Sequence, residues 1–216
     1  MLVSIGIVAL MFIGSAVAST AYIDRFPEEV PTHWNLHGVA DGHMSRDHTF
    51  MIFYLLPTVT AGLVALSVVF PWLSPQHFKV DEFRPTYDYV FAICTALFAW
   101  MHVVFLISAA DSDLYGRWLT AGMFLFFALL GNVLGKVRKN FWMGVRTPWT
   151  LASDVVWEKT HRLAAWLFVA MGLAGFAAAL AGLHVLLCFS LIMIAAVTSV
   201  IYSLVTYKRL EKAGGL

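Results

Sequence analysis

LLCFSLIMIAAVTSVIYSLVT, residues 186–206, decides the fold, because this long apolar stretch contains no charged side chain. At a rise of about 1.5 Å per residue, a helix of this length crosses a hydrocarbon core about 30 Å thick. Hydrocarbon offers no hydrogen-bond partners to backbone N–H and C=O groups, so a lipid-exposed segment must be helical. The stretch therefore predicts a membrane-spanning helix near the end of the chain.

Five further apolar runs precede it, and together they predict an all-α membrane protein, a bundle of about six transmembrane helices. The composition agrees, because 60% of the 216 residues are hydrophobic and only 12% are charged. The first run could alternatively be a signal peptide, since Ala16 and Ala18 before Ser19 resemble a cleavage site, although no charged segment precedes it. The six runs are Leu2–Tyr22, Phe50–Trp72, Tyr89–Ala110, Trp118–Leu134, Leu163–Leu183 and Leu186–Thr206.

Charge and cysteine content exclude several functions. The net charge of +1 provides no basic field for a nucleic-acid backbone, so direct nucleic-acid binding is not expected. Cys94 and Cys188 lie inside apolar runs without metal-ligand spacing, and we interpret both as packing thiols. We expect a single membrane domain over 1–216, with no cofactor and no catalytic residue.

The distribution of Lys and Arg orients the bundle. Eleven of these cations fall in the second and fourth loops and the tail, whereas three fall in the first and third loops. Cytoplasmic loops carry the excess of cations, so both termini and the inner loop 135–162 are expected in the cytoplasm. The outer loop 23–49 is then expected outside, the segment 50–134 holds helices two to four, and 163–206 forms a helical hairpin.

The outer loop, DRFPEEVPTHWNLHGVADGHMSRDHTF, is expected to be compact and rich in turns, because Pro27 and Pro31 block regular helix. Its histidines allow three interpretations: a metal site, a solvated loop, or a surface that meets an extracellular peptide through Trp34. Ser45 is placed to cap the second span. The candidate binding residues are His33, Trp34, Asn35, Gly38 and Asp41, and the ligands of the alternative metal site are His33, His37 and His43.

The inner loop contains the stretch RTPWT, where the proline forces a break between the fourth and fifth spans. After Thr150 the pattern becomes helical and is expected to continue into the fifth span, with Glu158 pairing with Arg162. Its aromatic and cationic residues indicate either a membrane surface or an ordered polar cluster that contacts a partner. The candidate binding residues are Asn140, Arg146, Thr147, Pro148, Trp149, Thr150, Trp157, His161 and Arg162.

Several residues inside the spans have competing interpretations. Small residues recur every four positions at Ala170, Ala174, Ala178 and Gly182, which predicts close packing of the last two helices. His102 is an ionisable group in the third span, and with Asn132 it could line the path of a small transporter or channel. The absence of broken helices and inverted repeats argues against transport.

Two motifs resemble one family. The inner segment resembles the signature of the SdpI family of toxin-immunity membrane proteins, and the outer loop is similar to the small uncharacterised domain that usually precedes it. The inner match comprises Gly131, Asn132, Asn140, Gly144, Arg146, Thr147, Pro148, Trp149, Thr150, Leu151, Trp157, Thr160, His161 and Arg162. The outer match comprises Pro27, Pro31, His33, Trp34, Asn35, Gly38, Asp41 and Gly42.

The resemblance implies a multi-pass protein of the bacterial plasma membrane that protects its cell from a secreted peptide toxin. It also implies a possible signalling role, in which the toxin-bound protein captures a cytoplasmic repressor at the membrane. The expected partners are therefore membrane lipids, a peptide toxin outside and a repressor protein inside. Family members with unknown roles are common, so an orphan paralogue is the other reading.

Overall fold

The computed structural model describes residues 1–35, 39–74, 80–108, 115–140 and 142–215. Within these ranges, six helices are long and apolar enough to cross a membrane, which confirms the predicted all-α bundle. They are α1 (Leu2–Thr20), α2 (Phe50–Leu73), α3 (Arg84–Ser108), α4 (Tyr115–Leu134), α6 (Asp154–Leu180) and α7 (Val185–Lys212).

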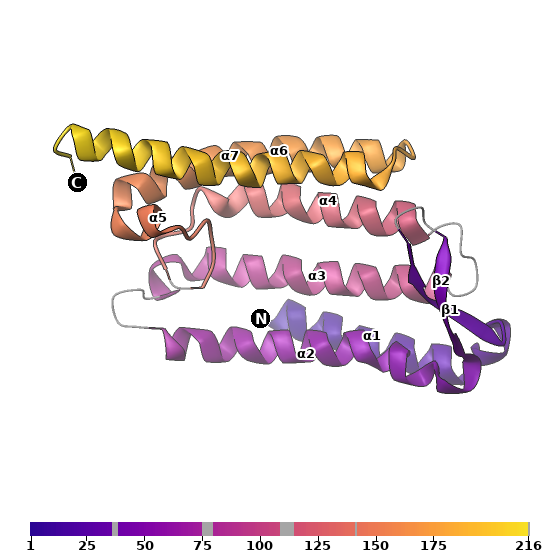
Figure 1. Cartoon of the computed structure of the whole chain (residues 1–216). Helices are drawn as coiled ribbons and strands as arrows, with labels where there is room; N and C mark the ends of the chain where they lie inside the picture. The colour runs from indigo at the N-terminus through magenta and orange to yellow at the C-terminus, as the bar shows by residue number, and fades with distance from the viewer. Residues whose placement is uncertain (36–38, 75–79, 109–114, 141, 216) are drawn as a thin grey trace.

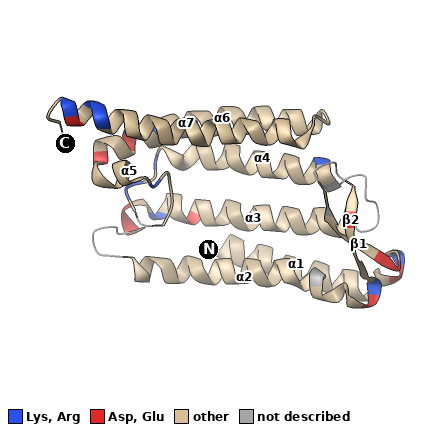
Figure 2. Cartoon of the chain, in the orientation of Figure 1, with Lys and Arg blue, Asp and Glu red and all other residues tan. Residues whose placement is uncertain are grey.

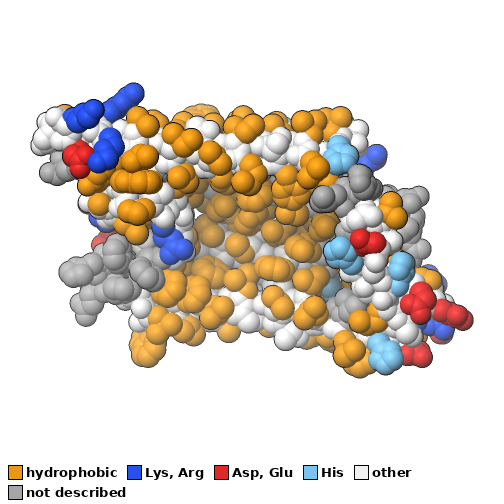
Figure 3. Space-filling view, viewed as in Figure 1, with side chains coloured by type: hydrophobic (Ala, Val, Ile, Leu, Met, Phe, Trp, Pro, Cys, Tyr) orange, Lys and Arg blue, Asp and Glu red, His pale blue; other side chains and the backbone are white. Residues whose placement is uncertain are grey.

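The helices form two groups of three (Figure 1). Helices α1, α2 and α3 pack on one another, as do α4, α6 and α7, and the contact of α3 with α4 joins the groups. Apolar side chains cover much of the face of the bundle that Figure 3 shows, while charged residues gather towards the two ends (Figures 2 and 3). Trp72 and Trp166 are 84% and 73% exposed. Such large apolar side chains are favourable in contact with lipid and unfavourable in contact with water.

Helices α4 and α6 make the closest contact because glycines line it. A Cβ at Gly131 would lie 2.7 Å from the Val169 nitrogen, and one at Gly172 would lie 2.6 Å from the Ala128 nitrogen. Small residues let helix backbones approach where hydrophobicity provides no driving force. Helix α6 also packs along α7, as predicted, but not through the predicted stripe, because Ala170 and Ala174 are exposed. The glycines of α6 face α4 instead.

Helix boundaries follow local chemistry. Helix α3 begins at Arg84 rather than at Tyr89, and the Arg84 guanidinium pairs with Asp88 one turn later, at 3.1 Å. Helix α6 is continuous from Asp154 to Leu180, so the predicted extension into the fifth span is confirmed. The connection to α7 turns at Gly182, whose φ of +74° lies in the left-handed region that favours glycine.

One end of the bundle carries an antiparallel hairpin of β1 (Glu29–Trp34) and β2 (Ala40–Ser45), flanked by the short 3-10 helices η1 (Ile23–Arg25) and η2 (Arg46–His48). The sequence predicted turns rather than strands. Ser45 does not cap α2, because η2 intervenes and Thr49 precedes the helix. The opposite end carries η4 (Val80–Phe83), the inner loop and the short helix α5 (Pro148–Ala152) (Figure 1).

Candidate functional site

The inner loop turns around Asn140, whose side chain is fully buried. Its Nδ2 donates hydrogen bonds to the carbonyls of Arg138 and Met143 at 2.9 and 3.0 Å. Its Oδ1 accepts from the N–H groups of Trp142 and Met143 at 2.7 and 2.8 Å. An amide side chain provides two donors and one acceptor oxygen, and this site uses all of them. Asn140 therefore shapes the loop and has no atom left for a ligand.

His161 connects the loop to α6. Its Nε2 accepts a hydrogen bond from the Val145 N–H at 2.9 Å, so its proton sits on Nδ1, which donates to the Trp157 carbonyl at 2.8 Å. The ring stacks on Trp157 with a centroid separation of 4.0 Å. A Cβ at Gly144 would lie 2.3 Å from Nε2, and the φ of Gly144 is +111°. Only glycine fits there.

The RTPWT stretch forms a capped helix start. The Thr147 hydroxyl accepts from the Thr150 N–H at 3.2 Å, while the Thr150 hydroxyl accepts from the Thr147 N–H at 2.9 Å. This reciprocal capping box places Pro148 in the first turn of α5, where its missing N–H costs nothing. Thr147 also contacts the Ser203 hydroxyl of α7 at 3.1 Å. The two threonines therefore hold α5 against the bundle.

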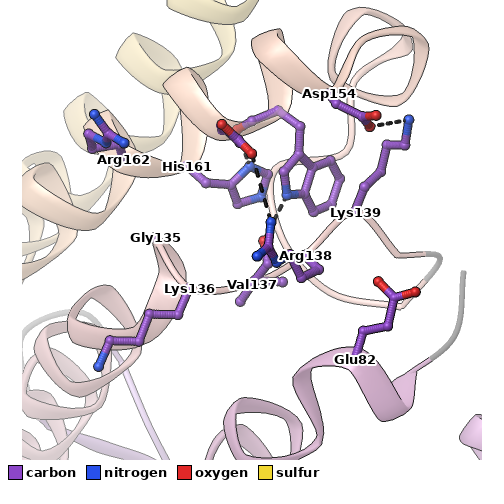
Figure 4. A pocket seen from close by; sticks show the side chains of 11 residues that line it. Glu82, Gly135, Lys136, Val137, Arg138, Lys139, Asp154, His161 and Arg162 are labelled. Carbon is purple, nitrogen blue, oxygen red and sulfur yellow. Dashed lines mark hydrogen bonds and ion pairs between the residues drawn. The ribbon is translucent and has the colours of Figure 1, made fainter.

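A polar pocket of about 720 Å³ opens between the start of α6 and the segment that follows α4 (Figure 4). Two ion pairs border it: Lys139 with Asp154 at 2.5 Å, and Arg138 with Glu158 at 3.9 Å. Glu158 therefore pairs across the pocket with Arg138, and the predicted bond to Arg162 is not among the ion pairs of the described residues. The lining residues are Glu82, Gly135, Lys136, Val137, Arg138, Lys139, Asp154, Trp157, Glu158, His161 and Arg162.

The predicted inner residues fall into three groups. Trp157, His161 and Arg162 line the pocket, although Trp157 and His161 are buried and already hydrogen-bonded. Asn140, Thr147 and Thr150 hold the loop from within. Arg146, Pro148 and Trp149 lie at the entry to α5, where Arg146 and Pro148 are exposed.

Sequence reasoning missed two acidic residues of the pocket, Glu82 and Asp154. Glu82 comes from η4, far from the inner motif in the chain, and Asp154 meets Lys139 only because α6 folds back along the loop. The paired residues lie on different segments of the chain, so no helical or strand spacing in the sequence predicts that they meet. The sequence also did not predict that Trp142 stacks on Phe70 of α2, with 4.3 Å between the ring centroids.

The outer hairpin presents an exposed ionisable pair. Nδ1 of His33 lies 2.5 Å from the Asp41 carboxylate, and these side chains are 72% and 44% exposed. A Cβ at Gly42 would lie 2.9 Å from His33 Cβ, so Gly42 allows the two strands to approach there. The side chain of Asn35 accepts a hydrogen bond from the Val39 N–H at 3.2 Å. The hairpin therefore holds His33 and Asp41 together on its surface.

Buried aromatic residues anchor the hairpin to the bundle. Val30 is fully buried and packs in a cluster with Phe26, Phe53 of α2 and Phe105 of α3. The Arg46 guanidinium donates to the Phe26 carbonyl at 3.2 Å. Ala18 of α1 completes this cluster, so three helices anchor the hairpin to the bundle.

The other outer predictions have different outcomes. Trp34 lies in β1 opposite Ala40, whereas Gly38 and His37 lie outside the described residues. His33 and His43 lie on paired strands, so His33 is not on the helical face that the metal interpretation assumed. No group of three possible metal-ligating side chains occurs among the described residues.

The structure separates the two residues proposed to line a transport path. His102 of α3 is buried, and its Nε2 lies 3.1 Å from the Ser15 hydroxyl of α1, which itself donates to backbone carbonyls such as that of Phe53 at 2.6 Å. Asn132 of α4 is exposed on the outside of the bundle. His102 therefore joins the first three helices, and Asn132 does not line a path with it.

Comparisons with known proteins agree with both motifs. Residues 136–203 match the SdpI/YfhL protein family, and residues 10–59 match a domain of unknown function, DUF1648. The chain is 26% identical over 220 residues to the Immunity protein SdpI of Bacillus subtilis (strain 168), an alignment covering 97% of each chain. No solved structure matches it. The two matched regions contain the inner loop and the outer hairpin, and the relative aligns along nearly the whole chain, so the chain resembles the SdpI/YfhL family at both motifs and along its length.

Proposed function

We propose that the protein is a bacterial plasma-membrane immunity protein that protects its cell from a secreted antimicrobial peptide, and that it acts by binding rather than by catalysis. The name of the Bacillus subtilis relative supports immunity. The observation that carries the proposal is the hairpin, which holds the exposed His33–Asp41 pair on an anchored platform. A rigid surface loses little conformational entropy when it binds a partner.

The charge of the outer segment suits a cationic or polar peptide. Residues 23–49 contain five carboxylates and two arginines, besides four histidines. Complementary charge raises the rate at which partners meet and excludes wrong ones. The proposed orientation, with both termini in the cytoplasm and the hairpin outside, rests on the excess of Lys and Arg in the opposite loops.

A killing assay tests the proposal. The chain is expressed in a sensitive Bacillus subtilis strain lacking its own SdpI, and cells are challenged with peptide-containing supernatant from the chain's source organism and, separately, from wild-type Bacillus subtilis. We expect survival to rise in at least one arm, compared with cells carrying the empty vector. Unchanged killing in both arms, with the protein present in the membrane fraction, contradicts immunity.

We also propose that a cytoplasmic repressor docks at the corner formed by α5 and the start of α6. Leu151 and Val155 are 37% and 45% exposed there, close along the chain to the exposed Arg146. An apolar patch with a neighbouring cation suits a protein contact. Membrane recruitment of a fluorescent repressor encoded beside the chain should fail in the R146A/L151A variant and persist in K212A. Recruitment that survives R146A/L151A assigns this corner to structure alone.

A further inference from the structure

The polar pocket lies where the membrane-spanning part of α4 ends. The apolar span of this helix ends at Leu134, and the pocket wall begins at the next residue, Gly135. The opposite wall is formed by the first turns of α6, up to Arg162. Lipid phosphates lie directly beyond the hydrocarbon core, so the pocket lies at the level of a headgroup.

Two cations of the pocket have no ion-pair partner among the residues that the structure describes. Arg138 and Lys139 are neutralised by Glu158 and Asp154. Lys136 and Arg162 are exposed, and neither makes a hydrogen bond or ion pair with the residues that the structure describes. Figure 4 shows them on either side of Gly135, with Glu82, the remaining acid of the lining, across the pocket from both.

An apolar cavity of about 260 Å³ adjoins this polar pocket, and Val137 lines both. Its other walls come from α3, α4, α6 and the inner loop, and include Cys94, Leu130, Met143 and Phe168. These side chains offer contacts for hydrocarbon and almost none for a polar group. A charged pocket beside an apolar one matches the two chemical parts of a phospholipid.

We propose that Lys136 and Arg162 bind the phosphate of an anionic phospholipid, one of whose acyl chains enters the apolar cavity. Guanidinium and ammonium groups are the usual ligands of phosphate, and each cation near an anionic membrane surface contributes to binding. The site differs from the outer hairpin and from the α5 corner, so it does not depend on peptide or repressor binding.

Native mass spectrometry of the purified full chain tests the site. The protein in detergent is titrated with phosphatidylglycerol or phosphatidylcholine, and the bound fraction of each is measured. We expect a preference for phosphatidylglycerol in the unmodified chain, and roughly thirty-fold weaker phosphatidylglycerol binding in K136A/R162A, since two cations are lost. Equal binding of the two lipids to the unmodified chain overturns the proposal.

Two further variants separate a site from general attraction. K159A/K212A removes two exposed cations outside the pocket and should retain the preference. K136R/R162K keeps both charges and should also bind. Its binding would show that lipid recognition requires a positive charge at these two positions. Equal loss in K136A/R162A and K159A/K212A means diffuse surface attraction and contradicts the site.

Competition distinguishes a lipid from a free anion. Inorganic phosphate or glycerol 3-phosphate at millimolar concentration should leave bound phosphatidylglycerol in place, because neither supplies an acyl chain for the apolar cavity. Displacement by either compound at that concentration contradicts the lipid proposal and assigns the pocket to a soluble phosphate.

Discussion

The two ends of the bundle use polar residues in opposite ways. At the inner end, the side chains of Asn140 and His161 are buried and form hydrogen bonds with other groups of the protein. At the outer end, His33 and Asp41 face solvent while apolar side chains such as Val30 do the anchoring. A motif residue can therefore serve recognition or construction, and burial distinguishes the two. We expect inner substitutions to reduce stability and outer substitutions to reduce protection.

The largest stability effect is expected at Asn140. Asn140→Ala removes four hydrogen bonds and leaves part-buried backbone groups unpaired, which should cost about 3–4 kcal/mol. Equilibrium unfolding in mixed micelles measures the loss. Asn132→Ala, on the exposed side of α4, is the matched control and should change stability by less than about 0.5 kcal/mol. Equal losses would show that the inner loop is not built on Asn140.

A smaller loss is expected at Gly144. In Gly144→Ala the new methyl group meets Nε2 of His161, and the residue must hold a φ of +111°, so about 2–3 kcal/mol should be lost. Gly6→Ala in α1 has no atom within 4 Å and should cost nothing. The two variants are compared by the same unfolding measurement. A neutral Gly144→Ala would mean that the loop does not pack on His161.

The anchor of the hairpin gives the next effect. Val30→Ala leaves a cavity among Phe26, Phe53 and Phe105, with an expected cost of about 1–2 kcal/mol. Limited proteolysis should cut the hairpin of this variant faster, whereas Val39→Ala, at a position 60% exposed, should be cut at the original rate. Unchanged proteolysis of Val30→Ala would show that the hairpin does not depend on this contact.

The smallest stability effect is expected on the hairpin surface. His33→Ala removes an exposed pair, and such pairs contribute little, so stability should stay within about 0.5 kcal/mol. Protection from the peptide should nevertheless fall. A large loss of stability in this variant would erase the difference between the two ends, because both would then be structural.

The sequence predicted the bundle well because lipid imposes a strong rule on every span. It also located both motif-bearing loops and the break at Pro148. It did not predict the strands, since β1 contains Pro31 and β2 contains Gly42, and both residues disfavour strands in isolation. The role of Asn140 was not visible either, because burial follows from how α4, α6 and the loop meet.

The packing of α6 shows the same limit. The alanine repeat predicted one contact face, but Gly172 and Gly175 form the actual contact with α4. Small residues lie on several sides of this helix, so spacing cannot select a face. The charged pocket was not predicted because its ion pairs join positions that lie far apart in the sequence.

The central claim is that the hairpin surface recognises the peptide, and paired variants in the killing assay test it directly. H33A/D41A removes the exposed outer pair, while K208A/E211A removes an exposed pair of the C-terminal helix, joined at 2.8 Å. Both variants are first shown to reach the membrane in equal amounts. Sensitivity to the peptide in H33A/D41A, with full protection in K208A/E211A, is the predicted result. Full protection in H33A/D41A contradicts the claim.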